Sequence, residues 1–134
     1  MEIPTTMPGI GHVAVTVTDV EASTEWYNRL LGTKPVLDED TGPFRHVVYA
    51  LGTTLFGLHG FPALTSEEPF DERRPGLDHV AFGVASRGEL EGWAARLDEL
   101  GIAHGEIKDA GYGSGLSFRD PDNIALEFFI APGT

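Results

Sequence analysis

The chain opens with an alternation of apolar and polar residues that is typical of a β-strand with one buried face. In residues 10–17 (Ile-Gly-His-Val-Ala-Val-Thr-Val), the three valines share one face, and the histidine, alanine and threonine share the other. Helical spacing follows, with Asp19 as a suitable N-cap and Gly32 as the C-terminal stop. The apolar runs after this helix predict three strands, near 34–39, 44–51 and 53–59.

The same order of elements returns in the second half. A strand predicted at 77–84 leads to Ser86, which begins a capping box with Glu89, and Gly101 ends the helix that follows. Three further strands are predicted near 102–108, 114–119 and 123–130. The pattern is β-α-β-β-β written twice, which predicts an α+β fold in a single domain, residues 1–134. Its parts are module one at about 8–60, a connector at 61–75 and module two at about 76–131.

The two modules read as a duplication. His12 and His79 lead equivalent strands and lie 67 positions apart. Near the end of each half the offset becomes 68, which matches His59 with Glu127. Modules related by a pseudo-twofold axis would bring these four side chains to one central point.

The alternation also predicts the face on which these side chains lie. Each helix must bury its apolar stripe on one face of its strands. The opposite face then carries the candidate ligands, with small neighbours such as Ala81, Gly57 and Ala125 that leave room for a substrate.

Three imidazoles and one carboxylate form a mixed nitrogen and oxygen donor set. This set suits a divalent transition metal (Zn, Ni, Fe, Mn or Co) without selecting one of them. Without a metal, a buried Glu127 would carry an uncompensated charge. We therefore predict a metal site of His12, His59, His79 and Glu127, in which His59 is a ligand, a proton shuttle or part of the pocket wall.

Composition narrows the choice of partners. A formal net charge of −12 disfavours nucleic acid and anionic membranes as partners. No apolar run approaches the roughly 18 residues that a membrane span requires, and the N-terminus lacks the features of a signal peptide. Without cysteine there is no disulfide, thiolate site or thiol nucleophile. A cytoplasmic protein that binds a small-molecule substrate is the resulting expectation.

Four segments carry a resemblance to a known family. They are Gly-Ile-Gly-His-Val-Ala-Val, Trp-Tyr-Asn-Arg-Leu-Leu-Gly, Gly-Leu-Asp-His-Val-Ala-Phe and Phe-Arg-Asp-Pro-Asp-Asn-Ile-Ala-Leu-Glu-Phe-Phe. Over about residues 8–131, the chain resembles the vicinal oxygen chelate (VOC) superfamily. This group includes glyoxalase I, extradiol dioxygenases, methylmalonyl-CoA epimerase, fosfomycin-resistance enzymes and bleomycin-resistance proteins.

The resemblance implies paired modules that form an open, U-shaped mixed sheet around a metal, and often a homodimer. It implies that His12 and His79 are ligands on the first strand of each module and that Glu127 is a ligand on the last strand. His59 then stands where glyoxalase I has a glutamate that binds the metal and moves protons. That substitution argues against strict glyoxalase I identity.

Three functions remain open. The first is a glyoxalase-type lyase or isomerase that transfers a proton beside a metal-bound carbonyl, with Glu127 or His59 as the base. The second is an Fe(II) dioxygenase of the extradiol type, for which His12, His79 and Glu127 suffice. The third is a non-catalytic binding protein that sequesters a drug or metabolite, as bleomycin-resistance proteins do; retention of all four ligand-type residues argues against it.

Four further residues are candidates for contact with substrate. Arg45 and His46 are neighbours on a predicted strand, so one of them should face the cavity. Tyr112 and Ser114 flank a glycine-rich loop, which we interpret as a mobile hairpin that covers the site.

Overall fold

The computed structural model describes residues 6–133 and divides the chain into two compact units. The first unit holds residues up to 28 and 32–65, and the second holds 29–31 and 66 onward. The division after residue 65 falls inside the predicted connector. That the units form one domain stays a prediction.

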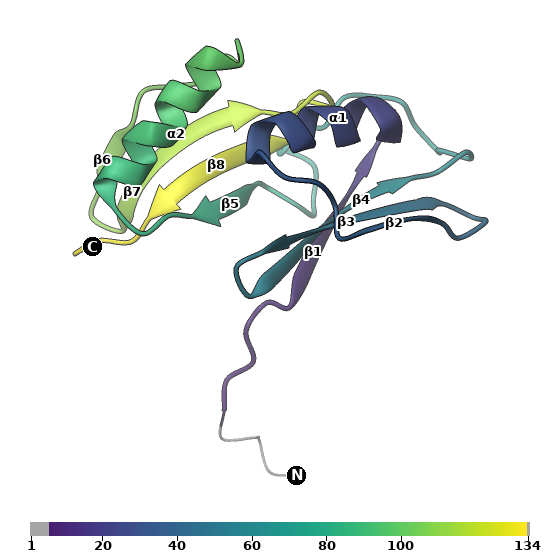
Figure 1. Ribbon diagram of the computed structural model, residues 1–134, viewed down its shortest axis with the longest axis horizontal. Coiled ribbons are helices and arrows are strands. Elements are labelled where there is room, and N and C mark those ends of the chain that lie inside the picture. Colours follow the sequence, from purple (N-terminus) through teal and green to yellow (C-terminus); the bar gives the residue numbers. More distant parts are fainter. Residues whose placement is uncertain (1–5, 134) are drawn as a thin grey trace. The chain divides into compact units, whose positions relative to one another are not determined.

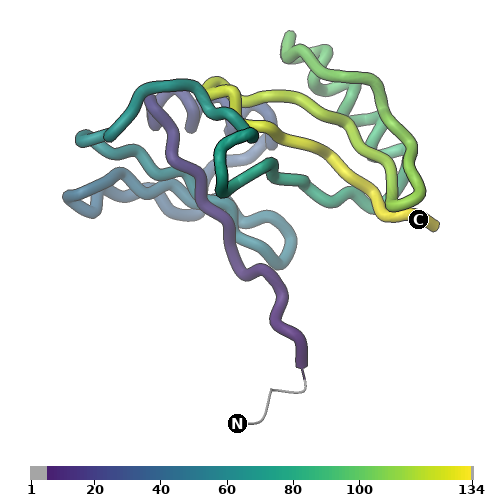
Figure 2. The backbone as a smooth tube through the Cα atoms, turned by 180° about the vertical axis from the view of Figure 1, so that it is seen from behind, coloured from purple at the N-terminus to yellow at the C-terminus, as the bar shows by residue number. Residues whose placement is uncertain are grey.

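The first unit is a four-stranded mixed sheet in the order β1-β4-β3-β2. β1 and β4 are parallel, and the other neighbours are antiparallel. The hairpin of β3 and β4 can be followed from both sides in Figures 1 and 2. Its elements are β1 (His12–Val17), α1 (Val20–Leu31), β2 (Leu37–Asp40), β3 (Arg45–Leu51) and β4 (Thr54–Gly60).

The second unit repeats this topology as β5-β8-β7-β6, with β5 and β8 parallel. Helix α2 lies along β7 and β8 (Figure 1). Its elements are β5 (Val80–Gly83), α2 (Arg87–Glu99), β6 (Lys108–Ala110), β7 (Gly113–Arg119) and β8 (Ala125–Ile130). Two mixed sheets, each with a helix, confirm the predicted α+β class and the predicted duplication of elements.

The helix ends follow the predicted capping chemistry. The Asp19 side chain accepts a hydrogen bond from the Ala22 amide (3.0 Å), and Gly32 ends α1 in the left-handed conformation (φ 66°). Ser86 accepts from the Glu89 amide (3.1 Å), and the Glu89 carboxylate accepts from the Ala85 amide (2.8 Å). Glu89 thus bonds one residue earlier than a standard capping box requires.

Aromatic side chains fill the core between each helix and its own sheet. In the first unit the buried Tyr27 of α1 packs on Tyr49 and Phe56, at ring-centre distances of 6.3 and 5.3 Å. In the second unit Trp93 of α2 stacks on Phe128 at 4.3 Å. Such burial supplies most of the stabilisation of a domain this small, and it leaves the other face of each sheet open.

One strand lies elsewhere than predicted. The sequence predicted a strand at 102–108, whereas β6 covers only Lys108–Ala110, where it forms a hairpin with β7. Upstream, His104 forms an isolated bridge with Phe118 of β7, and the Gly105 amide donates to the Ser117 carbonyl (2.9 Å). The His104 side chain is bound there by Asp98 and the Gly105 carbonyl, at 2.7 Å each. His104 thus connects this segment to the end of α2, and the segment pairs with β7 as an isolated bridge.

No helix among residues 6–133 is long and apolar enough to cross a membrane.

Candidate metal and substrate site

The open face of the first sheet carries three histidines around a cavity. His12, His46 and His59 line a cavity of ≈ 440 Å³ together with apolar and small residues from all four strands and the segment before β2. The face assignment predicted from alternation is correct here, because Val15 and Val17 are buried on the helix side while His12 is exposed.

Strand pairing corrects the equivalence between His59 and Glu127. His12 pairs with Leu55, and His59 lies four positions further along β4. In the second unit Val80, which directly follows His79, pairs with Leu126, so Glu127 is only two positions beyond the level of His79. The residue of the first unit that corresponds to Glu127 is therefore Gly57.

The correction alters the separation of the candidate ligands. Four positions along a strand span about 13 Å, against about 7 Å for two positions. The register therefore separates His59 from His12 along the sheet by more than it separates Glu127 from His79. Because metal–nitrogen bonds are near 2.1 Å, the larger separation is less favourable for two ligands of one ion. The displacement by two residues keeps the side chain on the predicted face, which is why alternation did not reveal it.

His59 belongs instead to a row of side chains that crosses three strands. His46 is its direct partner on β3, and Glu39 is the partner of His46 on β2. The two imidazole rings are 5.0 Å apart, and the Nδ1 atom of His46 is 3.6 Å from the Glu39 carboxylate. Phe44 stacks on His59 at 4.5 Å. Burial, with the neighbouring His46 and His12, lowers the pKa of His59, which favours its neutral form.

His79 is held by its neighbour in the second unit. Its Nδ1 atom is 2.7 Å from the Asp78 carboxylate, so the hydrogen-bonded neutral tautomer keeps Nε2 free as a lone-pair donor. A carboxylate behind a histidine in this way is typical of metal ligands, because it fixes the ring and strengthens the donor nitrogen. His79 is exposed, so nothing in its own unit covers it.

Glu127 lies over a glycine on the adjacent strand. A Cβ atom on Gly115 would be 2.6 Å from the Glu127 Oε2 atom, so the carboxylate occupies the space that a side chain there would fill. Glu127 is half-buried, which corrects the assumption that it is buried. The imidazoles of His12 and His79 and the carboxylate of Glu127 are donor groups of the kinds that fit a divalent transition metal.

Neither unit, by itself, completes the predicted site. Within residues 6–133 no group of three or more His, Asp or Glu side chains is gathered closely enough to hold a metal. His12 and His59 belong to the first unit, and His79 and Glu127 to the second. The four-ligand site thus stays a prediction.

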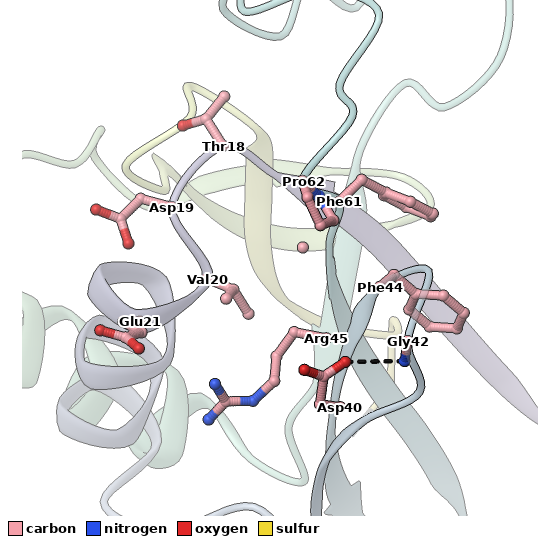
Figure 3. Close-up of a pocket in the computed structure, with 11 residues that line it drawn as sticks. Thr18, Asp19, Val20, Glu21, Asp40, Gly42, Phe44, Arg45, Phe61 and Pro62 are labelled. Carbon is pink, nitrogen blue, oxygen red and sulfur yellow. Dashed lines mark hydrogen bonds between the residues drawn. The ribbon is translucent and has the colours of Figure 1, made fainter.

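Arg45 and His46 face opposite sides of their sheet, and only His46 lines the histidine cavity. Arg45 makes two hydrogen bonds to Asp38, at 2.5 and 3.0 Å. It lines a separate cavity of ≈ 440 Å³ with acidic residues including Glu21 and Asp40 (Figure 3). Of this pair, His46 is the residue on the histidine-lined cavity and Arg45 is not; contact of either with substrate stays a prediction.

Tyr112 and Ser114 lie on the β6–β7 hairpin. Tyr112 is exposed and stacks on Phe129 with ring centres 6.4 Å apart. The Ser114 hydroxyl donates to Asp109 (2.6 Å), which also accepts from Arg87 (2.5 Å). Contact of Tyr112 and Ser114 with substrate stays a prediction.

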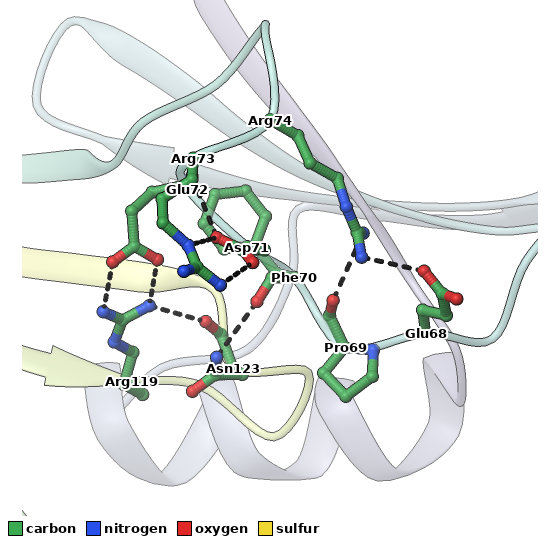
Figure 4. Close-up of polar contacts among 9 residues, drawn as sticks. All are labelled: Glu68, Pro69, Phe70, Asp71, Glu72, Arg73, Arg74, Arg119 and Asn123. Carbon is green, nitrogen blue, oxygen red and sulfur yellow. Dashed lines mark hydrogen bonds and ion pairs between the residues drawn. The ribbon is translucent and has the colours of Figure 1, made fainter.

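The connector is fixed to the second unit by charged groups. Glu72 accepts two hydrogen bonds from Arg119, at 2.8 and 2.9 Å, and the Asn123 side chain donates to the Phe70 carbonyl (Figure 4). Arg73 pairs with Asp71 in the same segment. Arg74 pairs with Glu68 in the same segment, so both connector arginines have carboxylate partners.

Sequence reasoning missed two residues that shape the site. Asp78 was visible beside His79, and its role could have been inferred from that adjacency. Gly115 was visible only as one of several glycines, because its role depends on the pairing of β7 with β8.

Comparison with known proteins gives a consistent family. Residues 9–128 match the model of the Glyoxalase/Bleomycin resistance protein/Dioxygenase superfamily. The metallothiol transferase FosB of Staphylococcus haemolyticus is 27% identical over 124 residues, which cover 89% of this chain and 81% of FosB.

Solved structures agree with this assignment. The glyoxylase/bleomycin resistance protein/dioxygenase domain from Frankia sp. EAN1pec is 34% identical, with a TM-score of 0.81, over 94% of this chain and 99% of that chain. The fosfomycin resistance protein FosX from Listeria monocytogenes shares the fold at 17% identity and a TM-score of 0.68, over 96% of this chain and 97% of that chain.

Proposed function

Because the chain belongs to the glyoxalase/bleomycin resistance protein/dioxygenase superfamily, we propose that it is a divalent-metal enzyme acting on a small molecule with two adjacent oxygens. The proposed reaction is a glyoxalase-type proton transfer beside a metal-bound carbonyl. Similarity to a metallothiol transferase supports a metal-dependent enzyme without specifying a glyoxalase.

The observation that carries the proposal is the hydrogen bond between Asp78 and His79. It places a carboxylate on one ring nitrogen and leaves the other available, as metal-binding histidines require. We assign His79, Glu127 and His12 as the ligands. A divalent ion held by them would act as a Lewis acid that stabilises negative charge developing on the substrate oxygens.

The protein's own residues would supply proton transfer and positioning. Glu127 is the proposed base, since its carboxylate reaches over Gly115 on the open face. The lowered pKa of His59 keeps this imidazole able to accept a proton at neutral pH. With the register found here, His59 fits a proton acceptor in the cavity wall better than a fourth ligand.

The test is metal binding by the purified protein and its variants. We expect a stripped protein to take up about one equivalent of Zn²⁺, Ni²⁺, Mn²⁺, Co²⁺ or Fe²⁺ per site. His79→Ala and Glu127→Ala should each weaken binding at least about tenfold, because each removes one donor. His104→Ala is the matched control, because His104 is bound by Asp98 and Gly105 away from the proposed ligands.

The outcome also separates the other functions. Failure of every ion to bind the wild-type protein would refute the enzyme proposal and favour a non-catalytic binding protein. Metal binding accompanied by oxygen uptake with catechols would favour a dioxygenase. Unchanged metal affinity in His79→Ala would remove His79 from the ligand set.

A further inference from the structure

We propose that the histidine-lined cavity of the first unit receives an uncharged, largely apolar part of the substrate and discriminates against anionic groups. This inference rests on the proposed function, which identifies the cavity as the substrate-binding site. It specifies the chemical class of substrate, which the family assignment does not.

The cavity wall is apolar apart from its imidazoles. Among residues 6–133, the lining contains no Lys, Arg, Asp or Glu; the lining residues other than the histidines are Ala14, Val36, Leu37, Val48, Leu55 and Gly57. Several of these side chains are open to solvent: Val36 is 65% exposed and Leu55 is 43% exposed. Covering such surface with an apolar ligand removes it from water, which favours binding.

The size of the cavity suits one small molecule. At ≈ 440 Å³, it lies within the range of roughly 300–1,000 Å³ that is typical of ligand pockets. Ala14 and Gly57 lie against each other on adjacent strands, and a Cβ atom on Gly57 would be 3.4 Å from that of Ala14. These two residues form part of the cavity floor, and their small size leaves space above them for a ligand.

The charges around the cavity are unfavourable for an anion. Glu39 lies beside His46 at 3.6 Å and adds negative charge next to the lining. Arg45, the cation nearest to His46 in sequence, faces the other side of the sheet and is bound by Asp38. An anionic group in the cavity would lose part of its hydration without a Lys or Arg side chain of the described lining to pair with.

Imidazole nitrogens can recognise uncharged oxygen atoms. Three histidines in an apolar wall offer a few convergent hydrogen-bonding groups, which is the usual composition of a specific small-molecule site. The ligand class is therefore an uncharged apolar molecule with carbonyl or hydroxyl oxygens.

A matched pair of fluorescent probes tests the charge preference. N-Phenyl-1-naphthylamine is uncharged, and 1-anilinonaphthalene-8-sulfonate has the same ring system with one sulfonate. We expect the uncharged probe to bind at least about tenfold more tightly, a difference of about 1.4 kcal/mol. The titrations use metal-stripped full-length protein, so they do not depend on the proposed ligands of the metal.

Variants localise the binding. Ala14→Phe fills the floor and should abolish binding of the uncharged probe. Ala110→Phe, at an exposed position on β6 outside the cavity, should leave it unchanged. Val36→Lys introduces a cation at the exposed rim and should raise the affinity for the sulfonate probe about fivefold or more, whereas Val36→Met serves as its uncharged control.

Equal affinity for the two probes would overturn the proposal, as would binding that survives Ala14→Phe. Failure of the uncharged probe to bind would also overturn it. Metal binding without probe discrimination would leave the proposed function intact and refute only this inference. Probe discrimination without metal binding would refute the proposed metal site and leave this inference intact.

Discussion

At the scale of single residues, the position of the Glu127 carboxylate depends on a missing side chain. Gly115 needs no left-handed backbone conformation, so alanine is compatible with its strand geometry. The conflict in Gly115→Ala is with Glu127, whose Oε2 and Cδ atoms would lie 2.6 and 2.9 Å from the new Cβ atom. Because the carboxylate is the mobile end of its side chain, it would move aside.

We therefore expect Gly115→Ala to weaken metal binding about tenfold or more while changing the free energy of unfolding by no more than about 0.5 kcal/mol. Titration with metal and urea denaturation measure the two quantities. Gly83→Ala on β5 is the control, since a Cβ atom there meets nothing within 4 Å. Equal metal affinities of the two variants would contradict this positioning role.

A second prediction concerns Asp78, which contacts His79 but is not itself assigned as a ligand. Asp78→Asn keeps the shape and removes the charge that strengthens the His79 donor. We expect the dissociation constant for metal to rise about 10–100-fold, the range found for such outer partners. Asp109→Asn, at an exposed aspartate bound by Ser114 and Arg87, should not affect it.

At the scale of elements, His104 connects the end of α2 to the segment beside β7. Hydrogen bonding to the Gly105 carbonyl and to Asp98 raises the pKa of His104 above its ordinary value of 6.5. A raised pKa in the folded state means that folding favours the protonated form. The stabilisation is therefore complete below pH 6.5 and is lost as the pH rises through the folded-state pKa.

The corresponding measurement is urea unfolding of wild type and His104→Gln at about pH 5.5 and pH 9. The loss of stability caused by the substitution should be larger at the lower pH. Asp98→Asn replaces the charged acceptor of His104 by a neutral one and should cause a smaller loss of stability, with the same dependence on pH. A loss that is greater at pH 9 would refute the assignment.

The helices and most strands could be predicted because their signals are local. Asp19, Ser86 and Gly32 mark helix ends through their own hydrogen bonds or backbone angles. The segment at 102–108 could not be predicted. Its apolar and polar pattern allows a strand, but the pairing with β7 that would form one depends on tertiary contacts that the pattern does not contain.

At the scale of the whole molecule, the contacts of Glu72 fix the connector to the second unit. Arg119→Gln removes both hydrogen bonds to Glu72 and should expose the connector to trypsin at the bond after Arg73, since Pro75 protects the bond after Arg74. We expect several-fold faster cleavage there, because proteolysis follows the population of locally open states. Arg87→Gln, which removes an exposed ion pair with Asp109, is the control.

The duplicated topology is also a property of the whole molecule. Both sheets have the same strand order, with one parallel and two antiparallel pairings. This arrangement explains why His12 and His79 stand at equivalent positions, at or just before the first strand of each unit. That the protein forms a homodimer stays a prediction, which sedimentation equilibrium can test.

The sequence by itself determined the helices, most of the strands and the face on which each candidate ligand lies. These properties follow from capping residues and from an alternation of period two, which each segment carries within itself. Only the tertiary structure decided the register, and with it that Gly57 rather than His59 corresponds to Glu127. A shift of two residues leaves every side chain on the same face, so the alternation cannot detect it, whereas the hydrogen bonds between paired strands fix it.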